Sequence, residues 1–387
     1  MKRNLLLTPG PTQIPPEICA VLGRPIIHHR TPQFQENLKE AVEGLKQVFQ
    51  TKNDVYLLTC SGTGAMEASV CNLLSSGDKA ITVEGGKFGE RWSELCRSYG
   101  VEPHVIHVPW GKSVDPAQIK KILDAHKDIK AVFITQSETS TGVTTDVEAV
   151  ARVVRNTSAV LVVDAVSGLG IIDLQMDNWG VDVVVSAAHK GFMLPPGLAF
   201  ISLSPRAFKL VETCKSPRYY FDLRKSKEAM TDIDTPFTPA IGIVIALNES
   251  LRRMKQEGLP NLFASYARLA KGTREAAKAL GLSIFTDESC QSNVLTAIKL
   301  PPEVDGNKVV KIMRDTHGIS VAGGQDSLKG KIIRIAHMGC VDEYDILTGI
   351  SCLEKVLLKL GYKFTLGAGV AAAQKVFNTQ DVKSKEP

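Results

Sequence analysis

The sequence lacks the long hydrophobic run that a membrane-spanning helix requires. Such a helix needs about 20 consecutive apolar residues, whereas the apolar stretches here, such as residues 159–163, end quickly at a charged residue. The apolar run near the N-terminus, residues 5–7, is also shorter than the roughly seven residues of a signal-peptide core. We therefore expect a cytoplasmic protein that has no membrane partner.

An excess of charge of either sign is also missing. The chain has 46 Lys and Arg residues against 41 Asp and Glu residues, a net charge of +5, and no basic cluster that could follow a phosphate backbone. Its eight cysteines form no C-x-x-C pair and no cluster of the kind that zinc and iron–sulfur sites require. We expect neither a nucleic-acid partner nor a metal site, and we expect reduced, mostly buried thiols.

The chain has instead the length and patterning of an α/β protein. Its 387 residues are enough for about two domains. Val- and Ile-rich runs alternate with segments of helical periodicity, which predicts a mostly parallel sheet covered by helices. The runs lie at residues 55–60, 80–83, 105–108, 131–135, 160–164, 183–186 and 198–203. Beyond about residue 240, long helical segments precede sparse strands at 294–300, 319–322 and 332–336 and a helix near 343–360, which indicates a smaller α+β unit.

Three positions that follow predicted strands carry chemically notable residues. Ligands of open α/β sheets bind beyond the carboxyl ends of the strands. The first of these positions is Ser61-Gly62-Thr63-Gly64, which opens a helix directly after a strand. Free N–H groups at a helix N-terminus, together with the hydroxyls of Ser61 and Thr63, form a site for a phosphate group. A plain helix-capping turn is the alternative for this segment alone.

Asp164 and Lys190 follow two further buried strands. A carboxylate is costly to bury unless it meets a cation, so we expect Asp164 to face a group such as a protonated ring nitrogen; a turn aspartate is the alternative. A lysine in a confined pocket has a lowered pKa and can attack an aldehyde, although a lone lysine is more often a surface charge. Together, the phosphate site, the aspartate and the lysine are what pyridoxal 5′-phosphate requires.

From residue 7 to about residue 361, the sequence also resembles the class V aminotransferases of the alanine–glyoxylate and serine–pyruvate type, members of fold type I of the pyridoxal-phosphate enzymes. Besides the segment around Lys190, the matching segments are residues 7–12 (LTPGPT), 61–64 (SGTG), 138–142 (ETSTG), 163–167 (VDAVS), 235–239 (TPFTP) and 334–339 (RIAHMG). The resemblance implies a large domain with a mostly parallel seven-stranded sheet and a smaller α+β C-terminal domain. We expect an N-terminal segment (1–20) that packs on the small domain and the active site, the large cofactor-binding domain (21–260), the small domain (261–370) and a polar tail (371–387).

The resemblance implies a role for individual residues as well. Lys190 would form the Schiff base and act as general base, and Asp164 would be the partner of the pyridine nitrogen. Arg334 would bind the substrate carboxylate with its planar fork, near Gly10. The further cofactor contacts expected are Ser61, Gly62, Thr63 and His189 at the phosphate, Phe88 on the ring face, and Thr139 near the ring oxygen. Thr235 and Thr238 would reach the phosphate of the partner subunit across a homodimer interface.

The expected function is the transfer of an amino group from a small amino acid, alanine or serine, to glyoxylate or pyruvate by a ping-pong Schiff-base mechanism. A small neutral donor is favoured because no second cation for a dicarboxylate stands near Arg334 or Gly10. Two alternatives stay open. His189 before the lysine is reminiscent of cysteine desulfurases, although residues 319–327 contain no cysteine and Cys340 comes after Arg334. Some relatives in this family have been labelled subunits of soluble hydrogenases, so a catalytically silent subunit is the second alternative.

Overall fold

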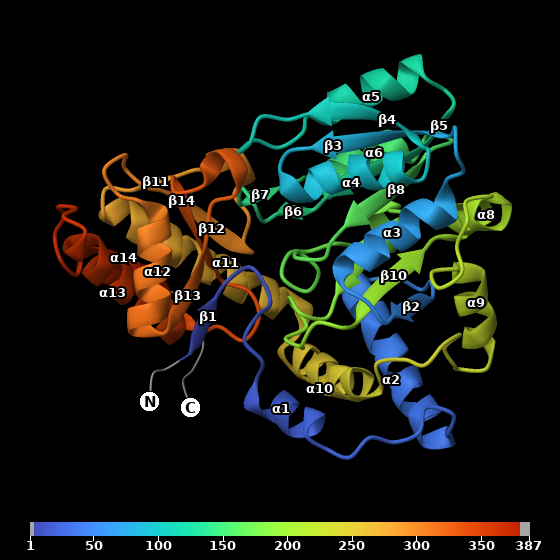
Figure 1. Ribbon diagram of the computed structural model, residues 1–387, viewed down its shortest axis with the longest axis horizontal. Helices are drawn as coiled ribbons and strands as arrows, with labels where there is room; N and C mark the ends of the chain where they lie inside the picture. The colour runs from blue at the N-terminus through green and yellow to red at the C-terminus, as the bar shows by residue number, and fades with distance from the viewer. Residues whose placement is uncertain (1–3, 380–387) are drawn as a thin grey trace.

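The molecule has two lobes, and the larger lobe is built on a seven-stranded sheet (Figure 1). The computed structural model describes residues 4–379. The strands of the larger sheet lie in the order β2-β10-β9-β8-β5-β3-β4. They are β2 (Val55–Leu58), β3 (Lys79–Glu84), β4 (Glu102–His107), β5 (Ile129–Thr135), β8 (Val160–Asp164), β9 (Val183–Ala187) and β10 (Ala199–Leu203). Because β10 alone is antiparallel to its neighbours in this sheet, the predicted mostly parallel sheet is confirmed.

The strands β2, β8, β9 and β10 are buried along their whole length because helices cover both faces of the sheet. One apolar core lies against α3, α4 and α8 and contains Trp92 and Phe133, whose ring centroids are 4.7 Å apart. The other lies against α2, α5, α6 and α10 and contains Phe192 and Phe200, whose centroids are 4.9 Å apart. The helices of the larger lobe are α1 (Pro16–Leu22), α2 (Pro32–Phe49), α3 (Gly62–Leu73), α4 (Lys87–Ser98), α5 (Pro116–Ala125), α6 (Val147–Val154), α7 (Met176–Trp179), α8 (Pro205–Thr213), α9 (Leu223–Thr231) and α10 (Ile241–Glu257).

The carboxyl ends of β2, β8 and β9 define one edge of the larger sheet. β8 and β9 are parallel neighbours, with Asp164 opposite Val185. β2 is antiparallel to β10, which is itself antiparallel to β9, so β2 runs in the same direction as β9. The chain segments that leave these three strands therefore begin at the same edge. A short two-stranded ladder, β6 (Ser137–Glu138) with β7 (Val143–Thr144), follows β5.

The smaller lobe is a five-stranded sheet with helices packed against it. Its strands lie in the order β1-β13-β14-β12-β11. They are β1 (Leu5–Leu7), β11 (Ser283–Ile284), β12 (Leu295–Lys299), β13 (Ile319–Gly323) and β14 (Ile332–Ala336), and the helices are α11 (Leu259–Ala279), α12 (Gly306–His317), α13 (Glu343–Lys359) and α14 (Ala368–Asn378). Two single 3-10 turns lie at Glu288–Cys290 and Asp326–Leu328. β1 pairs in parallel with β13, so the N-terminal strand belongs to this sheet before the chain crosses to the larger lobe. The expected domain limits stay predictions.

The C-terminal segment differs from the polar tail expected from residue 371. Residues as far as Asn378 are helical, because α14 carries apolar side chains that pack against α11 and α13. Phe377 is buried and its ring occupies the space above Gly272, where a Cβ atom would collide with it. The rest of the expected tail, residues 380–387, lies outside the described residues. Within residues 4–379, no helix is long and apolar enough to cross a membrane.

Candidate active site

The N-terminus of α3 lies at the sheet edge where β8 and β9 end. Ser61 is the N-cap residue of α3, and its side chain makes no capping hydrogen bond. Gly62 is needed at the first helical position because a Cβ atom there would lie 2.7 Å from Cγ2 of Val166. The hydroxyls of Ser61 and Thr63 and the free amides of the first turn therefore surround one end of the site, as a phosphate group requires.

Asp164 ends β8 and is 4% exposed. Its Oδ1 accepts a hydrogen bond from the backbone N–H of Val166 at 2.8 Å. Burial raises the pKa of Asp164 to about 6, against the opposing effects of the Val166 N–H and the charges of Arg91 and Lys190. A cationic ring nitrogen beside Asp164 would favour the ionised form of the carboxyl group. The site therefore suits a ligand whose ring nitrogen can carry a positive charge.

Lys190 follows β9 and is held by the N-terminal segment. It is 7% exposed, and its Nζ donates a hydrogen bond to the backbone carbonyl of Pro9. The hydroxyl of Thr12 donates to the Lys190 carbonyl at 2.9 Å. Gly10 has a φ of +113°, and a Cβ atom there would lie 2.5 Å from Nζ of Lys190. Only glycine allows this approach, since it tolerates a positive φ and has no Cβ.

The surroundings of Lys190 keep its amine reactive. Burial is the main cause that lowers the pKa of Lys190 to about 8, and the positive charges of Arg334 and Arg91 lower it further, while Asp164 raises it. An amine with a pKa near 8 is neutral, and so nucleophilic, far more often at neutral pH than an ordinary lysine. The lowered pKa matches the predicted role of this lysine as a nucleophile towards an aldehyde.

His189 contributes a neutral imidazole with an unused nitrogen. Burial, followed by the charge of Lys190, lowers the pKa of His189 to about 4. Its Nδ1 is buried and has no hydrogen-bond partner among the described residues. A buried polar atom without a partner is costly, so this nitrogen indicates a further group that binds here.

These residues line one cavity of about 180 Å³. Its lining brings together the predicted residues Ser61, Gly62, Thr63, Phe88, Asp164, His189 and Lys190, and it adds Met66, Arg91, Ser137, Val166 and Ser167. A phosphate site, a carboxylate that calls for a cation, a nucleophilic amine, an aromatic ring and an unpaired imidazole nitrogen fit pyridoxal 5′-phosphate. A larger cavity, of about 520 Å³ between α10 and residues 339–345, contains none of the predicted residues.

Glu138 positions Phe88 and was not anticipated from the sequence. It is buried, and its Oε2 accepts hydrogen bonds from the backbone N–H groups of Phe88 at 3.0 Å and Gly89 at 2.9 Å. Its Oε1 accepts from the N–H of Ser140 at 3.0 Å and from the Ser140 hydroxyl at 2.5 Å. Glu138 therefore fixes the start of α4 to the loop that carries Thr139. Glu138 stands in the matched segment 138–142, but nothing local in the sequence indicates its contacts with Phe88 and Gly89.

Arg334 connects the two lobes. It lies on β14 and is buried. Its Nε donates to the carbonyl of Gly323 at 2.9 Å and its Nη1 donates to the carbonyl of Thr139 at 2.6 Å. Nη2 makes no hydrogen bond with any residue between 4 and 379 and can still donate two. Burial lowers the pKa of Arg334 to about 10, opposed by the charge of Glu138, so its guanidinium stays protonated at neutral pH.

Thr235 and Thr238 lie away from this cavity within the protomer. They border a separate small cavity with Thr59, Tyr220 and Phe237, and the Thr235 hydroxyl donates to the Phe237 carbonyl at 2.8 Å. Within one protomer, Thr235 and Thr238 do not line the cavity that contains Lys190. Their expected role towards a partner subunit stays a prediction.

Comparisons with known proteins agree with the chemistry of this cavity. The model of the aminotransferase class-V family matches residues 8–341. The chain belongs to this family.

The aminotransferase is similar to several proteins along almost its whole length. It is 44% identical to the soluble hydrogenase small subunit of Synechococcus sp., covering 97% of this chain and 99% of that protein. It is 39% identical to the L-aspartate–glyoxylate aminotransferase of Paracoccus denitrificans, covering 96% of each. Among solved structures, the ureidoglycine–glyoxylate aminotransferase of Bacillus subtilis matches with a TM-score of 0.94 and 28% identity, covering 98% of this chain and 99% of that chain.

Family membership confirms several expectations together. The fold is that of fold type I, the protein is a transaminase that moves an amino group to a 2-oxo acid, and its cofactor is pyridoxal 5′-phosphate. The roles expected of individual residues stay predictions.

Proposed function

We propose that this transaminase takes a small amino acid, alanine or serine, as amino donor and glyoxylate or pyruvate as acceptor. The observation that carries the proposal is the cavity in which the buried amine of Lys190 lies with Asp164 and the N-terminus of α3, together with the charge of Arg334 acting on that amine. When bound, pyridoxal 5′-phosphate supplies an electron sink that makes the C–H bond at the substrate α-carbon acidic.

The chain's own residues divide the remaining work. Lys190 would hold the cofactor through its Nζ and, once the substrate amine has displaced that Nζ, would act as general base and accept the proton of the substrate α-carbon. Asp164 would keep the ring nitrogen cationic, and Arg334 would bind the substrate carboxylate through its free Nη2. Phe88 would supply an aromatic face to the cofactor and exclude water. At the phosphate and ring oxygen we assign Ser61, Gly62, Thr63, His189 and Thr139.

The neighbourhood of Arg334 supports a small, neutral donor. Its guanidinium already donates to the carbonyls of Gly323 and Thr139, which leaves Nη2 for one carboxylate. The other arginine of the cavity, Arg91, is hydrogen-bonded to Thr63 at the N-terminus of α3, the end that we assign to the phosphate. The backbone of Pro9 and Gly10 lies against the amine of Lys190, so a side chain at position 10 would occupy the space beside that amine. Gly10 therefore belongs to the substrate site, as a residue that admits substrate by having no side chain.

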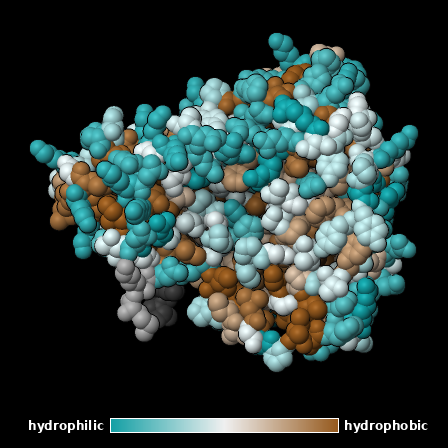
Figure 2. Space-filling model, in the orientation of Figure 1, coloured by the Kyte–Doolittle hydropathy of each residue, from teal (hydrophilic) through white to brown (hydrophobic). Residues whose placement is uncertain are grey.

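We also propose a homodimer with shared active sites. Three aromatic rings gather beside the two threonines: Phe237 lies 5.1 Å from the exposed Tyr220 and 5.6 Å from the exposed Tyr219, measured between ring centroids. Figure 2 shows apolar side chains gathered over α1 and α10, where Val21, Leu22, Ile243 and Ile245 are only partly buried. Apolar surface of this kind supports a subunit contact through which Thr235 and Thr238 reach the phosphate site of the partner subunit.

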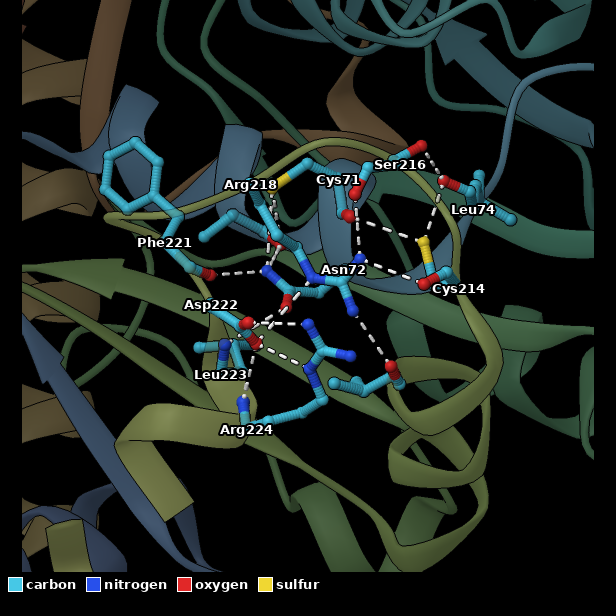
Figure 3. Close-up of polar contacts among 12 residues, drawn as sticks. Cys71, Asn72, Leu74, Cys214, Ser216, Arg218, Phe221, Asp222, Leu223 and Arg224 are labelled. Atoms are coloured by element: carbon cyan, nitrogen blue, oxygen red, sulfur yellow. Dashed lines mark hydrogen bonds and ion pairs between the residues drawn. The ribbon is translucent and has the colours of Figure 1, made fainter. Parts of the chain in front are cut away.

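The chain on both sides of Tyr219 and Tyr220 is anchored to the larger lobe by hydrogen bonds of Arg218 and Asn72 (Figure 3). The guanidinium of Arg218 donates to the carbonyls of Val211, Cys214 and Ser216 at 2.9–3.1 Å. Asn72 on α3 donates to the Phe221 carbonyl at 2.6 Å and accepts from the Leu223 N–H at 3.1 Å. An ordered surface loses less entropy on association, which supports the homodimer. The eight unpaired cysteine thiols support a cytoplasmic location.

Two alternatives are weaker. A desulfurase requires a cysteine nucleophile near the lysine, but Cys340 lines the larger cavity beside Tyr266 instead. A catalytically silent subunit has no need for a buried lysine, a buried aspartate and a buried arginine at one site, each of which is costly to keep. The presence of Lys190, Asp164 and Arg334 together favours an active enzyme.

The test of the donor is a transamination assay. Holoenzyme is incubated with alanine, serine or aspartate and with glyoxylate or pyruvate, and the amino acid produced is measured. Turnover should be fastest with alanine or serine, absent in Lys190→Ala, and unchanged in Lys271→Ala, a matched change on the exposed side of α11. Preference for aspartate would overturn the proposed donor, and activity of Lys190→Ala would overturn the role of Lys190.

A further inference from the structure

Arg91 is an unassigned cation in the cofactor cavity. It lies on α4, one turn after Phe88, and lines the same cavity as Lys190. Its Nη1 donates a hydrogen bond to the hydroxyl oxygen of Thr63 at 3.1 Å. Its guanidinium carbon lies 5.0 Å from the centroid of the Phe88 ring. The side chain thus reaches from α4 across the aromatic ring to the N-terminus of α3.

The guanidinium of Arg91 forms no ion pair with residues 4–379. No carboxylate in the described part of the chain lies within ion-pair distance of its guanidinium, whose contacts are Thr63 and the Phe88 ring. Other arginines of the larger lobe do pair, for example Arg206 with Asp182. An arginine stays protonated at all physiological pH values, so Arg91 presents a permanent positive charge to the cavity.

The other groups at the phosphate end of the cavity are neutral. Ser61 and Thr63 offer hydroxyls, the first turn of α3 offers amides, and His189 is a neutral imidazole because burial and Lys190 lower its pKa. Lys190 has to be neutral to react with an aldehyde. A phosphate monoester carries a charge of about −1.5 to −2 at pH 7, so among the residues that line this cavity Arg91 is the cation that can balance it.

We propose that Arg91 is a phosphate-binding residue of this site. The inference rests on the proposed function and adds to it a residue that acts in two ways. Its guanidinium pairs with the cofactor phosphate directly, and its hydrogen bond to Thr63 sets the direction of that hydroxyl. Because the Thr63 oxygen accepts from Arg91, the hydroxyl hydrogen of Thr63 is free to be donated to the phosphate.

The proposal is tested by comparing two ligands that differ in the phosphate alone. Cofactor-free wild-type protein and the variants Arg91→Met, Arg91→Lys and Arg97→Met are titrated with pyridoxal 5′-phosphate and with pyridoxal, and binding is followed by absorbance and by quenching of tryptophan fluorescence. Arg97 is the matched control because it is an exposed arginine in the last turn of the same helix. Inorganic phosphate is added as competitor in a second series.

Loss of one charge-assisted contact predicts a dissociation constant for pyridoxal 5′-phosphate that is about 10- to 100-fold higher in Arg91→Met. Arg91→Lys keeps the charge and should lose less, whereas Arg97→Met should bind like the wild type. Pyridoxal should bind equally to all four proteins. Inorganic phosphate should compete with the cofactor in the wild type and much less in Arg91→Met.

Three results would overturn the inference. Unchanged cofactor affinity in Arg91→Met would show that Arg91 does not contact the phosphate. An equal loss of affinity for pyridoxal would assign Arg91 to the ring or to the packing of α4. Failure of the wild-type protein to bind pyridoxal 5′-phosphate at all would overturn the proposed function itself, and this result is distinguishable because it does not depend on the variant.

Discussion

Replacing Lys190 by methionine should change the stability of the cofactor-free protein in a pH-dependent way. The amine is 7% exposed, and its burial lowers its pKa from the ordinary 10.5 to about 8. The folded state therefore holds the lysine proton less tightly than the unfolded chain does. Methionine has a similar length and no charge, so the variant removes the titration while keeping most of the packing.

The difference between the two pKa values sets the magnitude. The shift in the pKa of Lys190 lowers the free energy of unfolding of the wild type by about 3 kcal/mol below pH 8, where the amine is charged in both the folded and the unfolded state. Between the two pKa values the unfolded chain still binds the proton and the folded state does not, so wild-type stability rises by about 1.4 kcal/mol per pH unit. The lost hydrogen bond from Lys190 to Pro9 costs the variant about 1–3 kcal/mol, which leaves it about 0–2 kcal/mol more stable at pH 7.

The assay is urea denaturation of cofactor-free wild-type protein and variant between about pH 7 and about pH 9.5. Over this interval the wild type should gain about 2 kcal/mol relative to Lys190→Met. Lys271→Met, on the exposed side of α11, should run parallel to the wild type throughout. If the profile of Lys190→Met is also parallel to that of the wild type, the amine is not desolvated and the argument for its reactivity fails.

Further predictions concern the groups around the lysine. Arg334→Gln should raise KM for donor and acceptor at least about tenfold with a smaller change in kcat, because the carboxylate is bound equally in ground and transition states; a change confined to kcat would contradict this role. Gly10→Ala should abolish cofactor binding without unfolding the protein, since its Cβ would lie 2.5 Å from Lys190 Nζ, and normal cofactor binding measured by absorbance would refute the close approach. Glu138→Ala should lower the free energy of unfolding by about 3 kcal/mol or more, because it leaves the N–H groups of Phe88, Gly89 and Ser140 without an acceptor; a loss below about 1 kcal/mol would show that water replaces the carboxylate.

Local patterns were sufficient to predict the sheet and most of the cavity. A strand apolar on both faces followed by a polar residue marked the ends of β8 and β9, and parallel strands bring such ends to one edge. That rule predicts Asp164 and Lys190 at the same edge of the sheet, and the structure places both in one cavity. The helix start after β2 added Ser61 and Thr63 by the same reasoning.

Residues that act through distant contacts were not predictable in this way. Glu138 is defined by hydrogen bonds to Phe88 and Gly89, some fifty residues earlier in the chain, and no local pattern reports them. Arg91 resembles any charged residue on an amphipathic helix until its contact with Thr63 is known. The C-terminal helix was missed because the polar and charged residues that close the chain drew attention away from the apolar residues before them, among which Phe377 packs on α11.

The central claim is that this chain carries out half of a transamination on its own, with Lys190 as the reacting group. The most direct measurement is the absorption spectrum of the purified holoenzyme before and after addition of alanine or serine, with no 2-oxo acid present. The account predicts that the visible band of the bound cofactor declines while one molecule of 2-oxo acid is released per site, and that Lys190→Ala shows neither change. A wild-type protein that binds the cofactor but releases no 2-oxo acid with any amino acid would contradict the account and favour a catalytically silent subunit.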